Sequence, residues 1–194
     1  MGFEMVVIGA SLGGLKTLKV LLSGLPARFP SPVAIVQHRS TESDELLPRL
    51  LQESCALPVS EPEDKEEAVP SHVYVAPADY HLLVEKGRFA LSTEAPVNYS
   101  RPSVDVLFET AADSYGMAVV GVILTGANAD GASGVRRVKR RGGLVVVQRP
   151  EDAESEVMPA AAIAAVHVDR VLPLMEIAPF LVKLCAPGAN LGHG

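Results

Sequence analysis

MVVIGASLGG, residues 5–14, joins a short apolar run to a glycine-rich turn that opens into a helical pattern. The run is rich in Val and Ile without polar alternation, which is typical of a strand buried on both faces. Between a strand and a helix, such a turn can bind a phosphate on the helix N–H groups. It can also expose Ser11 as a nucleophile, because residues 9–13 fit the pattern G-x-S-x-G. A third interpretation makes Ser11 the N-cap of the following helix.

Apolar runs and helical patterns alternate through the rest of the chain. The pattern predicts strands at Met5–Gly9, Val33–Gln37, Val73–Ala76, Ala118–Leu124, Leu144–Gln148 and Val166–Val171. It predicts helices at Leu15–Leu22, Asp44–Glu53, Pro102–Ser114, Ala132–Arg141 and Met158–Ala165. This alternation indicates an α/β fold, a doubly wound and mainly parallel sheet with helices on both faces. His81–Val84 and Arg88–Ser92 predict a small antiparallel hairpin in addition.

Composition is that of an ordinary globular domain. The 194 residues are 48% hydrophobic and 21% charged. A chain of this length can form one domain whose core is stable without a disulfide or a structural metal. A net charge of −6 gives no basic excess for binding nucleic acid. The first residues do not form a signal peptide, and the longest apolar run, Met117–Leu124, is too short to span a bilayer. Cys55 and Cys185 are isolated, and no His or Cys spacing is typical of a metal site. We expect a cytoplasmic protein that does not insert into membranes.

Three side chains follow predicted strands, where open α/β sheets bind their ligands. Ser11, His38 and Asp130 offer a hydroxyl, an imidazole and a carboxylate, the parts of a nucleophile–base–orienter set. A dinucleotide site is excluded, since it needs glycine at Ser11 and an acidic residue at His38. Each residue also has a structural interpretation: a helix cap, a core histidine and a turn aspartate. Their joint occurrence at strand ends favours catalysis.

Further cleft candidates lie near another predicted strand end. Asp79 and His81 follow the run that ends at Ala76, although Asp79 is equally suited to shaping a turn. Arg101 precedes Pro102, which we place at the first position of the following helix. The basic cluster at residues 136–141 is more typical of a solvated helix face than of a docking patch.

Several ordered motifs together resemble the catalytic domain of the chemotaxis protein-glutamate methylesterases, the CheB family. The resemblance runs from about Val6 to about Val171. It rests on Gly9-Ala10-Ser11-Leu12-Gly13-Gly14, Val36-Gln37-His38, Val73 to Asp79, Arg101-Pro102-Ser103-Val104-Asp105 and Val122 to Ala132.

The resemblance implies a role for each of the three strand-end residues. Ser11 would be the nucleophile, His38 the general base and acid, and Asp130 the group that orients the imidazole. Backbone N–H groups near Leu12 and Ala127 would stabilise the oxyanion. The implied reaction is hydrolysis of glutamate γ-methyl esters on the cytoplasmic helices of methyl-accepting chemoreceptors. It releases methanol and needs no metal or organic cofactor, and some members also deamidate receptor glutamines.

The sequence departs from the family pattern in three places. Leu12 stands where threonine is common, and Ala127 and Asn128 replace Met and Gly in the loop before Asp130. Asn is the residue best able to replace a glycine at positive φ. Many members also carry an N-terminal receiver domain. Here we expect a single catalytic domain over residues 1–194, no receiver domain in this chain, and a separate regulatory protein.

Two other functions remain open from the sequence. One is a non-enzymatic domain that binds receptor helices with a decayed site. The other is a serine hydrolase that acts on a different ester, which Leu12 beside the nucleophile leaves open.

Overall fold

The computed structural model describes residues 2–39 and 46–188. The strands of this part are β1 Met5–Ala10, β2 Val33–Gln37, β3 Val59–Ser60, β4 Val73–Val75, β5 His81–Glu85, β6 Arg88–Ser92, β7 Val119–Ile123, β8 Leu144–Gln148 and β9 Arg170–Leu172. The helices are α1 Gly14–Ser23, α2 Leu46–Gln52, α3 Val104–Tyr115, α4 Ala132–Arg140, α5 Val157–Ala165 and α6 Leu174–Cys185, with short 3₁₀ turns at Gly116–Ala118 and Pro150–Asp152.

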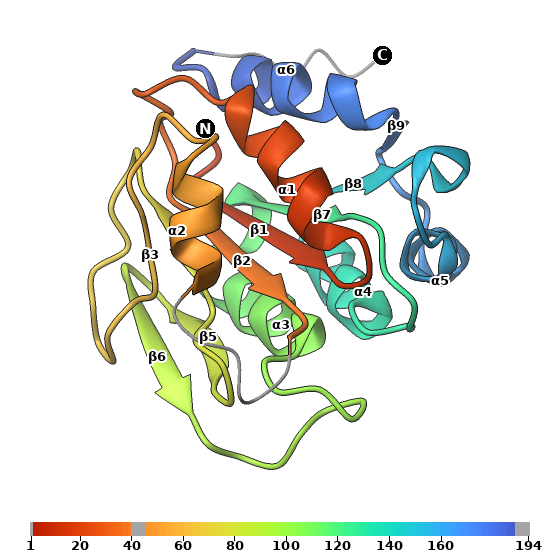
Figure 1. Ribbon diagram of the computed structural model, residues 1–194, viewed down its shortest axis with the longest axis horizontal. Coiled ribbons are helices and arrows are strands. Elements are labelled where there is room, and N and C mark those ends of the chain that lie inside the picture. The colour runs from red at the N-terminus through yellow and green to blue at the C-terminus, as the bar shows by residue number, and fades with distance from the viewer. Residues whose placement is uncertain (1, 40–45, 189–194) are drawn as a thin grey trace.

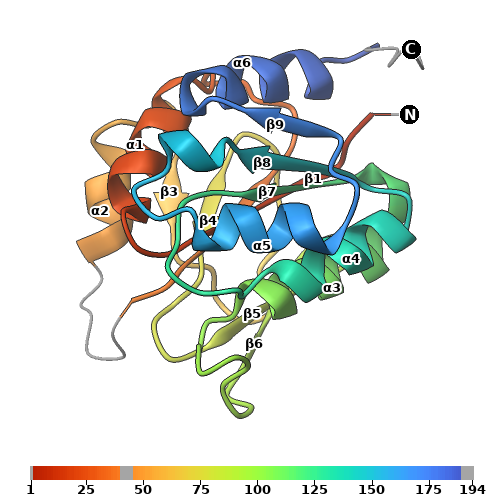
Figure 2. The ribbon, with the colours of Figure 1, turned by 90° about the vertical axis from the view of Figure 1, so that its right-hand side faces the viewer.

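The main sheet has the strand order β3-β4-β2-β1-β7-β8-β9, and every neighbouring pair is parallel. Helices α1, α2 and α6 cover one face, and α3, α4 and α5 cover the other (Figures 1 and 2). The predicted doubly wound α/β fold is therefore confirmed, with strands that are apolar on both sides because both sides are buried.

Two core layers follow from this arrangement. Val6 and Ile8 of β1 pack into the layer beneath α1, α2 and α6, whereas Met5 and Val7 point into the layer above α3, α4 and α5. Alternate residues of a strand face opposite sides of a sheet, so one uninterrupted apolar run serves both layers.

The predicted hairpin is also confirmed, as a separate sheet of β5 and β6. It lies against α3, where the N–H of Val84 donates to Thr110 Oγ1 at 3.1 Å. Ser114 Oγ in turn donates to the Val84 carbonyl at 2.8 Å. The hairpin thus extends the core layer of α3, α4 and α5 beyond the main sheet.

The chain reverses its direction of winding at β1. It leaves β1 through α1 for β2 on one side, and it leaves β7, the neighbour on the other side, through α4 on the opposite face. Connections that diverge in this way leave a crevice at the carboxyl ends of the two strands. Ser11 and the loop before Asp130 lie at this switch point.

Some predicted boundaries were wrong. Helix α3 begins at Val104, so Pro102 lies before the helix, after a cis peptide bond, and Ser103 takes the N-cap position. Strand β9 begins only at Arg170, because the apolar run at Val166 forms a loop that packs against the core layer of α3, α4 and α5. Of the predicted helix at residues 44–53, the first two residues lie outside the described part.

Two elements were not predicted. Strand β3 has only two residues, too few to show a pattern. Helix α6 buries Ile177, Leu181 and Leu184 at helical spacing, but it contains Pro179, a residue that argues against a helix interior.

Candidate active site

Ser11 directly follows β1 and is fixed through its backbone. Its N–H donates to the Thr125 carbonyl at 2.9 Å, and its carbonyl accepts the Gly14 N–H at 2.9 Å. Gly13, with φ +76°, turns the chain into α1 and takes the N-cap position in place of Ser11. The hydroxyl therefore does not cap the helix, and Oγ has no hydrogen-bond partner among the described residues.

His38 follows β2 in register with Ser11 on the neighbouring strand. Its N–H donates to the Ala10 carbonyl at 3.0 Å, and Ala10 and Gln37 are paired one residue earlier. Neighbouring strands lie about 4.8 Å apart, so the sheet itself places the two residues side by side, and both line one cavity. The His38 side chain is 11% exposed, and its Nε2 lies 2.8 Å from Asp130 Oδ2.

The carboxylate of Asp130 is buried in a shell of donors. It accepts the Ser103 hydroxyl at 2.9 Å and the N–H groups of Val104 and Asp105, which open helix α3, at 2.7 and 3.1 Å. Burial alone would raise the pKa of Asp130, but the hydrogen bonds from His38 and from these N–H groups outweigh it and lower the pKa below 3.8. Asp130 is thus an ionised acceptor at neutral pH, and the ring nitrogen that faces it, Nε2, carries the proton.

The other ring nitrogen, Nδ1, is therefore the basic one. Asn128 Nδ2 donates to it at 3.1 Å, and Asn128 Oδ1 accepts the N–H of Asp130, also at 3.1 Å. Asn128 has no positive φ, so the expectation that it replaces a glycine for its left-handed backbone was wrong. Asn128 instead contributes to the site through its side-chain amide, which contacts both His38 and Asp130.

A second buried carboxylate, Asp105, supports the first. Its Oδ1 accepts the N–H groups of Gly131 and Gly134 at 2.9 and 2.7 Å, which ties α3 to the start of α4. Asn98 bridges the two carboxylates, 2.9 Å from Asp105 Oδ2 and 3.4 Å from Asp130 Oδ1. Burial raises the pKa of Asp105, and the nearby charge of Asp130 adds to this. In the sequence, Asp105 is only one member of a motif, and nothing in its context distinguishes it from other acids in a first helical turn.

Ser11 and His38 open into one shallow cavity of about 560 Å³. Its other lining residues are Leu12, Gly13, Gly14, Leu15, Lys16 and Gln37. Leu12 is 54% exposed at the rim. The N–H groups of Leu12 and Ala127 have no acceptor among the described residues, as oxyanion donors require.

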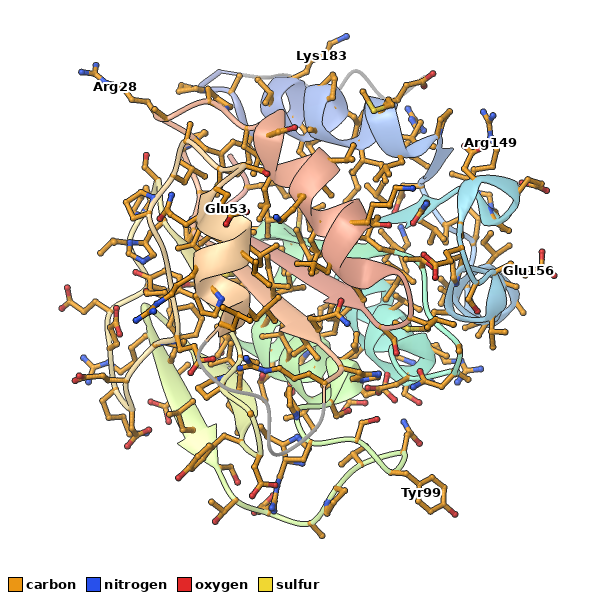
Figure 3. All side chains as sticks on the ribbon, viewed as in Figure 1. Arg28, Glu53, Tyr99, Arg149, Glu156 and Lys183 are labelled. Carbon is orange, nitrogen blue, oxygen red and sulfur yellow. The ribbon has the colours of Figure 1, made fainter. Side chains whose placement is uncertain are left out.

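A second cavity of about 340 Å³ also has His38 in its lining, and it lies between Asp79, Arg101 and the loop around Tyr99. Asp79 accepts two hydrogen bonds from Arg101, at 2.6 and 3.0 Å, and so it is committed to that ion pair. Tyr99 projects into solvent from the loop that follows β6 (Figure 3).

His81 stands apart from both cavities. Only 2% of it is exposed, with Nε2 3.1 Å from the Ala95 carbonyl and Nδ1 accepting the Ser103 N–H at 3.3 Å. It holds the segment before α3 in place, although at sequence level it was a cleft candidate.

Neither a metal cluster nor a membrane helix occurs in the described ranges. No group of three or more His, Cys, Asp or Glu side chains there is arranged to hold a metal ion. No helix there is long and apolar enough to cross a bilayer.

Comparison with known proteins places this site in a family. The model of the CheB methylesterase family matches residues 6–181. A relative from Leptospira interrogans, named for protein-glutamate methylesterase and protein-glutamine glutaminase activity, is 49% identical over 95% of this chain and 96% of its own length. A relative of the same name from Thermotoga maritima is 37% identical over 93% of this chain, which spans 54% of that relative's length.

A solved structure agrees with the sequence relatives. The crystal structure of the Thermotoga maritima CheB methylesterase catalytic domain superposes with a TM-score of 0.90 at 36% identity, over 95% of this chain and 100% of that one. The family predicted from the motifs is confirmed, and with it the prediction of a methylesterase-type hydrolase. The chain belongs to the CheB methylesterase family.

Proposed function

We propose that this chain is a serine esterase that hydrolyses glutamate γ-methyl esters on the cytoplasmic helices of methyl-accepting chemoreceptors and releases methanol. The observation that carries the proposal is the alignment of Ser11 and His38 at adjoining strand ends, with Asp130 bound to the far side of the imidazole at 2.8 Å. The names of the family relatives supply the substrate class. A cytoplasmic location follows from that substrate, and we place regulation in a separate protein.

In the first half of the reaction, Ser11 Oγ attacks the ester carbonyl while its proton passes to His38 Nδ1. The resulting imidazolium is stabilised by the ionised Asp130. The tetrahedral oxyanion accepts the N–H groups of Leu12 and Ala127, and each such donor contributes roughly 10²–10³ in rate. The C–O bond to the methoxy group then breaks, and Nδ1 returns its proton to the leaving methanol.

The second half repeats the same proton path with water. His38 Nδ1 takes a proton from water as its oxygen attacks the acyl carbon, and the proton goes back to Ser11 Oγ as the acyl bond breaks. The product is the free glutamate side chain. A glutamine amide in place of the ester would lose ammonia by the same steps, which accounts for the second activity in the relatives' names.

Methanol release from a methylated receptor fragment tests the proposal. Replacement of the nucleophile in Ser11→Ala should lower kcat by on the order of 10⁴–10⁶, because a triad acts as a unit. Ser23→Ala is the matched control, since Ser23 is an exposed serine at the far end of α1 whose hydroxyl donates only to the Val20 carbonyl. Equal activity in wild type and Ser11→Ala would refute the nucleophile assignment.

The same assay separates the other two functions. A wild-type protein that binds the receptor fragment without releasing methanol would be a binding domain with a decayed site. A protein that cleaves small esters and ignores the methylated receptor would be a hydrolase for a different ester.

A further inference from the structure

We infer that Asn128 is a positioning residue that occupies the basic nitrogen of His38 in the resting enzyme and must release it before Ser11 can be deprotonated. The inference rests on the proposed function, because it concerns the proton that His38 takes from Ser11. It begins from one contact, the 3.1 Å hydrogen bond from Asn128 Nδ2 to His38 Nδ1.

The direction of the Asn128 amide is set by its other end. Oδ1 accepts the N–H of Asp130 at 3.1 Å, so the NH₂ group is the end that faces the ring. Turning the amide over would place two donors together at the Asp130 N–H. It would also place a carbonyl oxygen against the Nδ1 lone pair. The amide is therefore locked as a donor to His38.

The imidazole is held from both sides as a result. Asp130, ionised and buried, accepts from Nε2, and Asn128 donates to Nδ1. A ring nitrogen has one in-plane lone pair, so Asn128 and the Ser11 hydroxyl compete for the same acceptor. Ser11 Oγ has no hydrogen-bond partner among the described residues, which is the arrangement expected while the amide holds the base.

Proton transfer reverses the chemistry at Nδ1. Once it has taken the Ser11 proton, Nδ1 is a donor, and the Asn128 NH₂ group has no lone pair to offer it. The amide must turn away. There is room for this, because Asn128 is half-buried while Ala127 and Ala129 beside it are exposed. Losing a neutral hydrogen bond of this kind changes a rate by about two- to tenfold.

Two substitutions separate this role from a purely structural one. Asn128→Ala removes the competing donor at a position whose backbone suits alanine. We expect kcat for methanol release to rise about two- to tenfold with KM nearly unchanged. Asn128→Asp keeps the shape but puts a carboxylate at Nδ1. That carboxylate favours a proton on Nδ1, so both ring nitrogens become donors, the base is lost, and activity falls.

Two further readouts do not need the receptor substrate. One is the rate at which a fluorophosphonate labels Ser11, which forms the Oγ–P bond and expels fluoride. The other is the ¹⁵N spectrum of the His38 ring, where loss of the Asn128 donor in Asn128→Ala should shift Nδ1 and leave Nε2 in place. Ala129→Gly, which changes the same loop but keeps the amide, should match wild type in both.

The outcomes are distinct. Labelling that rises in Asn128→Ala and falls in Asn128→Asp supports the inference, whereas labelling that falls in both variants overturns it. An Nδ1 resonance that is the same in wild type and Asn128→Ala also overturns it. A protein that labels as expected but releases no methanol from receptor contradicts the proposed function and leaves the role of Asn128 intact. If Ser11 cannot be labelled at all, the ring spectrum still decides whether Asn128 holds Nδ1.

Discussion

His38 Nε2 lies 2.8 Å from Asp130 Oδ2, a contact between two residues that are 92 positions apart in the chain. The carboxylate is also held independently of the ring, because the first N–H groups of α3 donate hydrogen bonds to it. An anion at the start of a helix is stabilised by the helix dipole and by the unpaired N–H groups there. The hydrogen bond to Asp130 therefore fixes which ring nitrogen carries the proton, and so which one is free to accept another.

Asp130→Asn should lower kcat by on the order of 10³–10⁴ while the protein still folds. An amide that faces Nε2 with its NH₂ group favours the wrong tautomer, with the proton on the nitrogen that Ser11 needs. Methanol release and circular dichroism would be measured together. Asp113→Asn is the control, since Asp113 pairs with Arg137 and Arg141 on the exposed surface. A loss of less than tenfold would contradict this role for Asp130.

The sequence predicted the strands and the strand-end residues because both follow from local patterns. An apolar run such as residues 5–8 has to be buried on both faces, and a parallel sheet gathers its carboxyl ends on one edge. Ser11, His38 and Asp130 could therefore be placed together without coordinates.

The rest of the site depends on contacts that no local pattern encodes. Asp105 reaches the start of α4 only because α3 and α4 pack side by side. Asn128 is a residue type that is common in ordinary turns. Its contact with His38 forms only when β2 and the loop after β7 are both in place. Helix α6 was not predicted: it contains Pro179, which argues against a helix interior, and the packing of its apolar face tolerates that proline.

Asp105 should make the protein less stable as the pH rises. Its folded pKa is raised above the ordinary value of 3.8, mainly by burial, so the folded state holds the proton more tightly than the unfolded chain. Its contribution to stability is therefore greatest below 3.8 and declines as the pH rises through the raised pKa. Urea unfolding of wild type and Asp105→Asn would measure this. The free energy of unfolding of wild type minus that of the variant should decrease from about pH 4 towards neutrality. Because Asp130 is present in both proteins, the difference between them reports on Asp105. A difference that grows with pH would contradict the prediction.

Cys185 should be inert in the folded protein. Burial raises the pKa of its thiol to about 11, so at pH 8 only about one molecule in a thousand carries the reactive thiolate. Burial also raises the pKa of Cys55. We expect both thiols to react with Ellman's reagent at least on the order of 10²-fold more slowly in native protein than in urea. Single Cys55→Ser and Cys185→Ser variants assign the two rates. Rapid labelling of one thiol in folded protein would contradict its burial.

Gly126→Ala should impair both catalysis and folding. A Cβ at this position would lie 2.9 Å from Ser11 Cβ and 2.0 Å from Met158 Sδ. The methionine can move, but the strand-end backbone of Ser11 cannot. The loop cannot retreat either, because the Gly126 N–H donates to the Ser155 carbonyl at 3.2 Å and the Gly126 carbonyl accepts the Met158 N–H at 2.9 Å.

The displaced nucleophile should lower kcat by roughly 10–10²-fold, since a shift of about 1 Å is enough for a loss of that size. Overpacking should cost about 1–3 kcal/mol in stability. Gly24→Ala is the matched control, because its Cβ would lie 2.6 Å from Ala178 Cβ, where α1 meets α6, away from the site. That variant should lose stability but keep its kcat. In the double variant Gly126→Ala with Met158→Ala the clash with Met158 is gone but the contact with Ser11 remains, so kcat should stay low. Recovery of kcat in the double variant would show that Met158, and not Ser11, is what Gly126 makes room for.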